Sequence, residues 1–185
     1  MPRVFIAIPT PVELQQALGD IQSTFRFESL SLRWVKPSHL HITLVFLGET
    51  PAAQLEKVSQ AMVQAVAGIS PFAVEALSLG CFPRPSQPRV LWMGLHDPSQ
   101  NLTRLYQQLI TVLQSLGFVG ENRAFHPHLT LAHIRKPARN PEFRSLLSIY
   151  DNRQFGHIRV EAVHLFESHL RPTGPVYTIL CSAYL

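Results

Sequence analysis

Apolar positions along the chain recur at two spacings, one typical of helices and one typical of strands. Two long segments, from Pro51 to Ile69 and from Pro98 to Gly117, carry an apolar residue at every third or fourth position, which predicts amphipathic helices. Shorter helices are expected to start at Pro11 and Pro141, because proline fits the first turn of a helix. Between the helices lie short runs rich in β-branched and aromatic residues, which predict strands. These runs are 3–8, 32–35, 39–47, 72–82, 89–95, 128–134, 158–166 and 176–184.

The order of these elements, β-α-β-β-α-β-β-α-β-α-β-β, predicts the fold class. Helices do not alternate one for one with strands, so the sequence favours an α+β fold with largely antiparallel sheets. The proline-rich segment 82–88 is too short to be a linker between domains. We therefore expect a single domain that covers residues 1–185.

One short motif occurs twice within the predicted strands. Residues 39–44 read His-Leu-His-Ile-Thr-Leu and residues 126–131 read His-Pro-His-Leu-Thr-Leu. Side chains alternate between the two faces of a strand, so His41 and Thr43 share one face while apolar residues occupy the other. His128 and Thr130 share a face in the same way. If the two halves of the chain pack with approximate two-fold symmetry, these four polar side chains converge in one cleft.

Two imidazoles and two hydroxyls in one cleft are suited to phosphoryl chemistry. A neutral histidine can take a proton from water while a protonated histidine donates one to the leaving oxygen, and histidine adopts both forms near neutral pH. The hydroxyls of Thr43 and Thr130 can donate to the non-bridging oxygens of the phosphate. The outer histidines are weaker candidates for contact with substrate. His39 shares the face of His41 by alternation, whereas His126 precedes Pro127 and is expected in the turn that enters the strand.

The overall charge favours a polyanionic partner, and the lack of a signal peptide or membrane span favours a cytoplasmic protein. The formal net charge is +4 and the sequence pI is about 9.4, which suits binding to RNA phosphates. The two cysteines lie far apart and lack zinc-finger spacing. The sequence contains neither a signal peptide nor an apolar run long enough to cross a membrane, so we expect no membrane association.

Two other functions compete with metal-independent catalysis. The H-x-H pairs could bind a metal ion, which would make the protein a metal-dependent phosphohydrolase. A catalytic metal site usually includes carboxylates, but Asp and Glu total only 12, and Glu49 is the only acid close after a motif. A noncatalytic RNA-binding module is the second alternative, although no aromatic RNP signature or GXXG loop appears.

The paired motifs resemble those of the 2H phosphoesterases, and more narrowly those of the LigT-like RNA 2′,3′-cyclic phosphodiesterases, also called 2′-5′ RNA ligases. The resemblance extends over nearly the whole chain, in the stretches 3–8, 41–49, 88–92, 125–132, 166–170 and 174–177. It implies one bilobal α+β domain, in which two pseudo-symmetric lobes of largely antiparallel sheet carry helices on the outside and an active-site cleft lies between them.

The same resemblance implies hydrolysis of RNA 2′,3′-cyclic phosphate ends to a 2′-phosphate without a metal. It also implies ATP-independent joining of RNA ends through a 2′-5′ linkage. We expect no other cofactor and a monomeric protein. His41 and His128 match the catalytic histidines of the family, and Thr43 and Thr130 match the phosphate-binding threonines. We assign His41 as the acid and His128 as the base.

The chain departs from the family pattern directly after the second motif. The family often reads T-L-A-R at this point, but here His133 stands in place of the arginine. Arg135 lies two residues further on, on the same face of the strand as His133, and is a candidate replacement. We therefore expect Arg135, His133 and the aromatic residue Phe5 to contact the nucleotide.

Overall fold

The computed structural model describes residues 1–24, 31–120, 124–135, 141–172 and 174–185 and confirms the α+β class. The described helices are α1 (Val12–Thr24), α2 (Ala52–Val66), α3 (Asn101–Gln114), α4 (Pro141–Ile149) and the short 3-10 turn η2 (Pro37–His39). The described strands are β1 (Arg3–Pro9), β2 (Leu32–Trp34), β3 (His41–Glu49), β4 (Phe72–Phe82), β5 (Val90–His96), β6 (His128–Ile134), β7 (Gln154–Val160), β8 (Ala162–Arg171) and β9 (Gly174–Tyr184).

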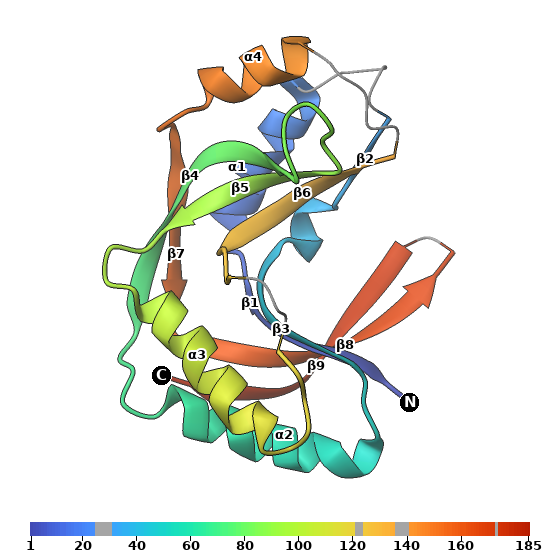
Figure 1. The fold of residues 1–185 in the computed structure, drawn as a ribbon, viewed down its shortest axis with the longest axis vertical. Coiled ribbons are helices and arrows are strands. Elements are labelled where there is room, and N and C mark those ends of the chain that lie inside the picture. Colours follow the sequence, from blue (N-terminus) through green and yellow to red (C-terminus); the bar gives the residue numbers. More distant parts are fainter. Residues whose placement is uncertain (25–30, 121–123, 136–140, 173) are drawn as a thin grey trace.

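All of these strands belong to one curved sheet, and their pairs are antiparallel (Figure 1). The order across the sheet is β7-β4-β5-β6-β3-β1-β8-β9, and β2 pairs with β6 at the side. The sheet has two halves, one from β7 to β6 and the other from β3 to β9. They meet at the two motif strands, where Ile42 pairs with Leu129. The two lobes are therefore halves of a continuous sheet, joined at their motif strands.

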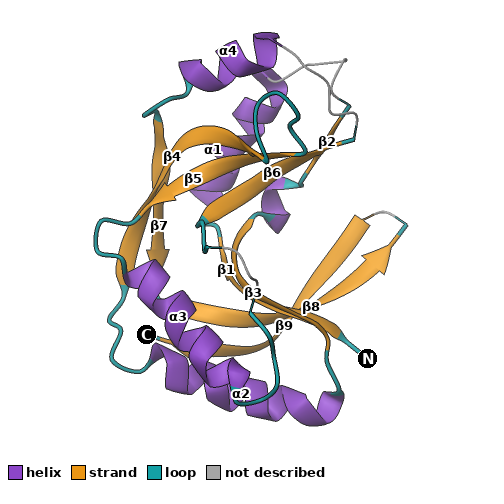
Figure 2. Ribbon diagram, viewed as in Figure 1, coloured by secondary structure: helices purple, strands orange, loops and turns teal. Residues whose placement is uncertain are grey.

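Each half of the sheet carries two helices on its outer side (Figure 2). Helix α1 contacts β7 and η2, and α4 contacts β4. Helices α2 and α3 contact each other, and they lie against β9 and β3 respectively. The predicted apolar stripe of α3 forms its buried face, because Leu102, Leu105 and Leu109 have no exposed surface. This burial fixes the helices on one face of the sheet and leaves the opposite face of the motif strands available for chemistry.

The prediction of a single strand over residues 158–166 is wrong. The segment contains the end of β7, which pairs with β4, and the start of β8, which pairs with β1 in the other half of the sheet. The exposed residue Glu161 separates the two strands. The sequence concealed this crossing because buried residues lie on both sides of it, with Ile158 and Val160 before and Val163 and Leu165 after.

The structure also shows whether the helices could span a membrane and whether the cysteines are paired. Among the described residues, every helix is too short or too polar to cross a bilayer. Cys81 and Cys181 are both free thiols, the first buried and the second half-buried. Burial raises the pKa of the Cys81 thiol to about 11, which keeps it in the unreactive protonated form at neutral pH.

Candidate active site

The pairing of β3 with β6 brings the two motifs side by side (Figure 1). Because the strands are antiparallel and Ile42 pairs with Leu129, His41 lies opposite Thr130 and Thr43 lies opposite His128. In a regular ladder, opposite residues are about 4.5–5.5 Å apart and diagonal residues about 7–8 Å apart. The two histidines occupy a diagonal of this kind.

All four polar side chains lie on the face of the sheet that the helices leave open. Ile42 and Leu129 are fully buried in the main apolar core. Side chains alternate along a strand, so the neighbours of these two residues point to the opposite face. The motif histidines and threonines are each only partly exposed there. The sheet therefore brings the two H-x-T motifs together at its centre, where each histidine lies beside the threonine of the other motif.

The backbone orients both catalytic candidates in the same way. Nδ1 of His41 lies 2.7 Å from the carbonyl oxygen of His39, and Nδ1 of His128 lies 2.6 Å from that of His126. A carbonyl oxygen only accepts hydrogen bonds, so each Nδ1 carries the proton and donates it. Each Nε2 is then the atom that exchanges protons with a ligand. The first residue of each H-x-H pair thus contributes its carbonyl group to the orientation of the second.

His39 lies beside the ring that also contacts His41, although it is not part of the strand. It ends the turn η2 and precedes β3, so strand alternation does not place it on the face of His41. Its ring lies 5.2 Å from the ring of Tyr177 on β9, which is also 5.5 Å from the imidazole of His41. Burial lowers the pKa of His39, and the nearby positive charge of Lys36 lowers it further.

Burial favours the neutral form of His41. It lowers the pKa of this imidazole from the ordinary value of 6.5, and the hydrogen bond to the His39 carbonyl only partly opposes the shift. A positive charge on His39 would act in the same direction as burial. In the free protein, His41 is therefore mostly neutral at neutral pH.

Aromatic rings from distant strands surround His41. The ring of Phe5 lies 4.9 Å from the imidazole, Tyr177 lies edge-on at 5.5 Å, and Phe166 lies at 6.4 Å. Phe5 has only 4% of its surface exposed, so its ring packs against the imidazole inside the protein. The accessible ring of the group is Phe46, which is 58% exposed and lies 5.9 Å from Phe5.

A second set of rings surrounds His128. Phe82 lies edge-on at 5.2 Å, and Trp92 lies 6.4 Å from the imidazole and 5.0 Å from His126. Trp92 pairs across the strands with Thr130, and its indole ring covers Gly80 on the neighbouring strand. Apart from Phe5, sequence analysis missed these rings, because they come from β3, β4, β5, β8 and β9 and share no pattern along the chain.

Gly80→Ala is expected to destabilise the protein. A methyl group at this position would lie 2.3 Å from the indole ring of Trp92, so the ring has to move. Such overpacking typically costs about 1–3 kcal/mol, which corresponds to a fall in Tm of roughly 2–4 °C per kcal/mol for a chain of this size. Thermal unfolding followed by circular dichroism measures the change.

Gly19→Ala is the matched control for this change. Gly19 lies in helix α1, and nothing lies within 4 Å of the position that its Cβ would take. Alanine is favoured over glycine in a helix by about 0.5–1 kcal/mol, so this variant should unfold at a higher temperature. If Gly80→Ala unfolds at or above the wild-type temperature, the packing of Trp92 on β4 is wrong.

A β-bulge after each motif reverses the alternation of faces. Ala132 pairs with Leu91 and Thr130 pairs with Trp92, so Leu131 is an extra residue on β6. Leu131 and Ala132 are both buried, while His133 and Arg135 are exposed. The bulge therefore brings His133 and Arg135 to the face of His128 and Thr130, although regular alternation would place them on the other side.

The same irregularity occurs in β3. Val45 pairs with Ile6 and Thr43 pairs with Ala7, so Leu44 is the extra residue. Leu44 and Val45 are both buried, and the exposed ring of Phe46 follows. The internal repeat thus continues past H-x-T-L through the bulge, and Phe46 occupies the position in the first half that His133 occupies in the second. An alignment of the two repeats beyond the motif would have revealed this equivalence.

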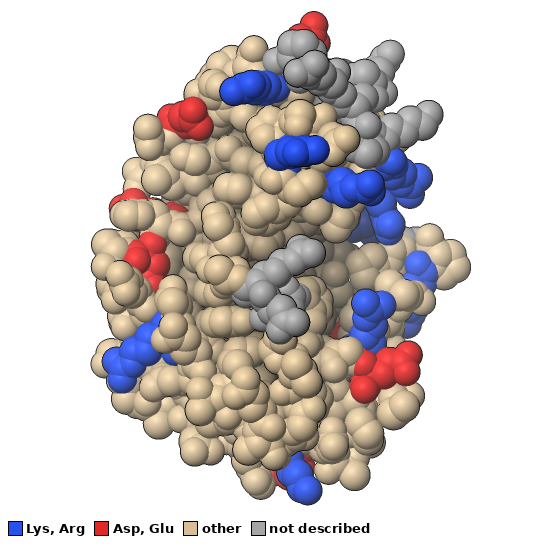
Figure 3. All heavy atoms as spheres, in the orientation of Figure 1, with Lys and Arg blue, Asp and Glu red and all other residues tan. Residues whose placement is uncertain are grey.

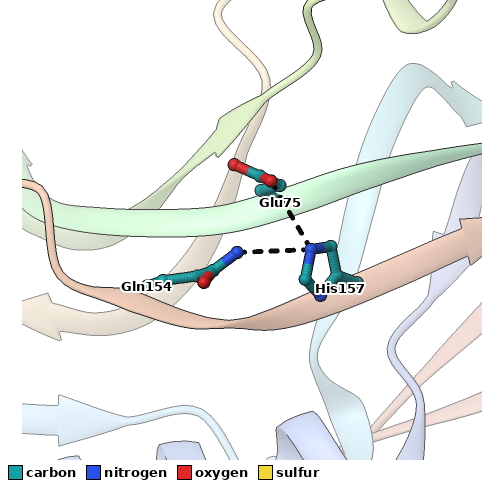
Figure 4. A network of polar contacts seen from close by, with 3 residues as sticks. All are labelled: Glu75, Gln154 and His157. Carbon is teal, nitrogen blue, oxygen red and sulfur yellow. Dashed lines mark hydrogen bonds and ion pairs between the residues drawn. The ribbon is translucent and has the colours of Figure 1, made fainter.

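The carboxylates Glu75, Glu49 and Glu167 lie away from the paired H-x-T motifs. Nε2 of His157 on β7 lies 3.5 Å from Glu75 and 3.2 Å from Gln154, on the outer part of the sheet (Figure 4). Glu49 lies at the far end of β3 from His41 and lines a hollow of about 310 Å³ with Glu167. Within the described ranges, no three residues among His, Cys, Asp and Glu lie close enough to share a metal ion.

Comparisons with known proteins agree with the paired motifs. A family model described as LigT like Phosphoesterase matches residues 8–92 and 95–177. RNA 2′,3′-cyclic phosphodiesterases from Methanothermobacter thermautotrophicus and Archaeoglobus fulgidus are 30% and 31% identical to this chain. The alignments cover 95% of this chain in both cases, and 95% and 96% of the respective relatives. The crystal structure of E. coli LigT complexed with 3′-AMP superposes with a TM-score of 0.80 at 26% identity, over 100% of this chain and 98% of the other.

Proposed function

This chain belongs to the LigT-like phosphoesterase family, and we propose that it hydrolyses the 2′,3′-cyclic phosphate at RNA ends to a 2′-phosphate by two-histidine acid–base catalysis. The observation that carries the proposal is the pairing of the two H-x-T strands, with each imidazole oriented by a backbone carbonyl. The curated relatives named as RNA 2′,3′-cyclic phosphodiesterases support the substrate class.

In the proposed reaction the two histidines act on opposite sides of the phosphorus atom. Nε2 of neutral His128 accepts a proton from water, whose oxygen forms the new bond to phosphorus. The bond from phosphorus to O3′ breaks, and Nε2 of protonated His41 donates its proton to O3′. The hydroxyls of Thr43 and Thr130 donate to the non-bridging oxygens and hold the phosphate in line. The phosphate remains on O2′, and the two histidines have exchanged protonation states.

The lowered pKa of His41 makes its role as an acid depend on the substrate. In the free protein, burial favours the neutral form of this imidazole. The cyclic phosphodiester carries a negative charge, and a negative charge nearby raises the pKa of a histidine. Substrate binding and protonation of His41 are therefore coupled, so the acid is charged when the phosphate is in place.

The pH dependence of the reaction should reveal this coupling. The acid has to be protonated and the base neutral, so the profile is bell-shaped. The profile of kcat/KM reports the free enzyme, and one of its two apparent pKa values should lie below the ordinary 6.5 of histidine, because burial lowers the pKa of His41. The profile of kcat reports the complex, where the negative charge of the substrate should shift this apparent pKa to higher pH. Initial rates on a cyclic mononucleotide across the pH range measure both profiles. Identical apparent pKa values in the two profiles would show that the substrate does not change the pKa of His41.

Hydrolysis of a 2′,3′-cyclic mononucleotide is expected to continue in excess EDTA. The proposed mechanism uses two imidazoles and two hydroxyls and assigns no step to a metal ion. Chromatography of the products against authentic 2′- and 3′-phosphates should identify the 2′ isomer. Loss of activity in EDTA with recovery on addition of zinc or manganese would favour the metal-dependent phosphohydrolase. Binding without any hydrolysis would favour the RNA-binding module.

The same arrangement supports the joining of RNA ends. A 5′-hydroxyl group can replace water as the nucleophile, and His128 would take its proton in the same way. The product is a 2′-5′ phosphodiester. Because one ester bond of the cyclic phosphate is exchanged for another, the step requires no ATP. We propose this ligation as a second reaction of the same site.

A further inference from the structure

At the same position of the repeat, one half of the site carries a phenyl ring and the other half carries an imidazole. Phe46 and His133 each follow the bulge after their motif and are both exposed. The motif strands run antiparallel, so the direction from His41 to Phe46 along β3 is opposite to the direction from His128 to His133 along β6. Phe46 and His133 therefore lie on opposite sides of the two catalytic histidines.

The strands next to His133 carry cationic side chains. Arg33 on β2 pairs directly across the strands with His133, and Arg135 lies two residues further along the same face. Both arginines are exposed, and Lys36 and Arg89 lie in the adjoining segments. The stretches 31–41, 89–96 and 124–135, which form β2, β5 and β6 with their approaches, contain no Asp or Glu. Lys and Arg side chains gather around the notch between β2 and the β8–β9 hairpin, at the right-hand edge of Figure 3.

The half that contains Phe46 is aromatic, with charges of both signs. The exposed ring of Phe46 continues the group formed by Phe5, Phe166 and Tyr177. Its charged residues are mixed in sign, because Arg3 pairs across the strands with Glu49. A nucleoside base stacks well on an accessible ring, whereas a sugar–phosphate backbone is held by arginine. The two halves therefore suit different parts of an RNA substrate.

We propose that the site holds two RNA segments, with the nucleoside that bears the cyclic phosphate on Phe46 and the backbone phosphate of the attacking strand on Arg33, His133 and Arg135. The proposal rests on the two-histidine function given above and specifies its second substrate, an RNA with a free 5′-hydroxyl. The ring of Phe5 lies 4.9 Å from the imidazole of His41, the acid for the leaving O3′, and 5.9 Å from the ring of Phe46, so the aromatic group adjoins the acid. His128, the base for the attacking hydroxyl, lies on the strand of His133.

Two dinucleotides test the cationic subsite as inhibitors of cyclic mononucleotide hydrolysis. The first is adenylyl-(2′→5′)-adenosine, and the second is the same compound with a 3′-phosphate on the second adenosine. The added phosphate should tighten inhibition of the wild-type protein about 10-fold, as expected for a contact between charged groups. Arg33→Ala and Arg135→Ala should each remove most of this preference, and Arg33→Lys should keep part of it. High salt should weaken the preference in the wild type.

Variants with matched exposure and charge serve as controls. Arg159→Ala removes one exposed positive charge from the edge strand β7 and should keep the full preference for the added phosphate. Phe46→Ala should weaken both dinucleotides by the same factor of at least about 5, the lower end for loss of one stacked base. Val63→Ala truncates an apolar side chain on α2 that is also 58% exposed, and it should change neither constant.

The outcomes separate this inference from the proposed function. If the wild type does not hydrolyse cyclic mononucleotides, the proposed function fails. If it hydrolyses them but both dinucleotides inhibit equally, the two-segment site is wrong. A preference that survives Arg33→Ala, Arg135→Ala and their combination would place the second phosphate elsewhere and would also overturn the inference. Circular dichroism of each variant establishes that loss of preference does not reflect unfolding.

Discussion

Alanine at His41 or at His128 is expected to lower kcat on a 2′,3′-cyclic phosphate by at least about 100-fold. Each change removes one of the two proton transfers, and a general acid or base typically contributes about 10²–10⁴-fold. Each imidazole is held by a carbonyl of its own chain, so its removal leaves the rest of the motif strand in place. Steady-state rates on a cyclic mononucleotide measure the loss.

A histidine outside the site, His157, is the appropriate control for these changes. His157→Ala removes an exposed imidazole from the outer part of the sheet and should retain the wild-type rate (Figure 4). His126→Ala should lose far less than His128→Ala, because the carbonyl group that orients His128 belongs to the backbone and is retained. Thr43→Ala and Thr130→Ala should also lose less, since each removes one hydrogen bond to the phosphate. Full activity in either His41→Ala or His128→Ala would overturn the two-histidine mechanism.

The second large effect is a recovery of activity that separates acid from base. An activated aryl phosphodiester has a leaving group that departs without a proton, so the acid is no longer required. His41→Ala should therefore recover much of its lost rate on this substrate, by a factor that approaches the 100-fold or greater loss. His128→Ala should recover little, because water still has to be deprotonated. The ratio of kcat/KM on the aryl and the natural substrates, measured for each variant, gives the result.

The outcome of this comparison assigns the roles directly. Recovery in His128→Ala alone would reverse the assignment, and the lowered pKa of His41 would then belong to the base. The pH profile does not by itself assign the roles, because its two apparent pKa values belong to the pair of histidines. The aryl substrate therefore decides which histidine is the acid and which is the base.

Sequence patterns predicted the local parts of the site well. The second motif strand was predicted at its observed bounds, His128–Ile134, and the repeat identified all four polar side chains that the strand pairing brings together. Both results depend on spacing within one strand. Alternation of faces and the clustering of β-branched residues are properties of a few consecutive residues, so they can be read from the sequence.

The parts that the sequence did not predict depend on contacts between distant segments. The bulges at Leu44 and Leu131 shift Phe46 and His133 to the active face, yet they are defined only by the pairing with β1 and β5. The aromatic residues around each imidazole come from several strands. The crossing at Glu161 was missed because the apolar pattern continues through it while the strand partners change.

The order of strands also has a consequence for folding during synthesis. The half of the sheet that contains His41 is completed by β8 and β9, the last strands to leave the ribosome, whereas β1 and β3 are among the first. Until β8 is made, the edge of β1 that it will cover lacks its partner. Domains generally fold as units as the chain emerges. The nascent chain therefore carries both motif strands well before it can form the complete sheet.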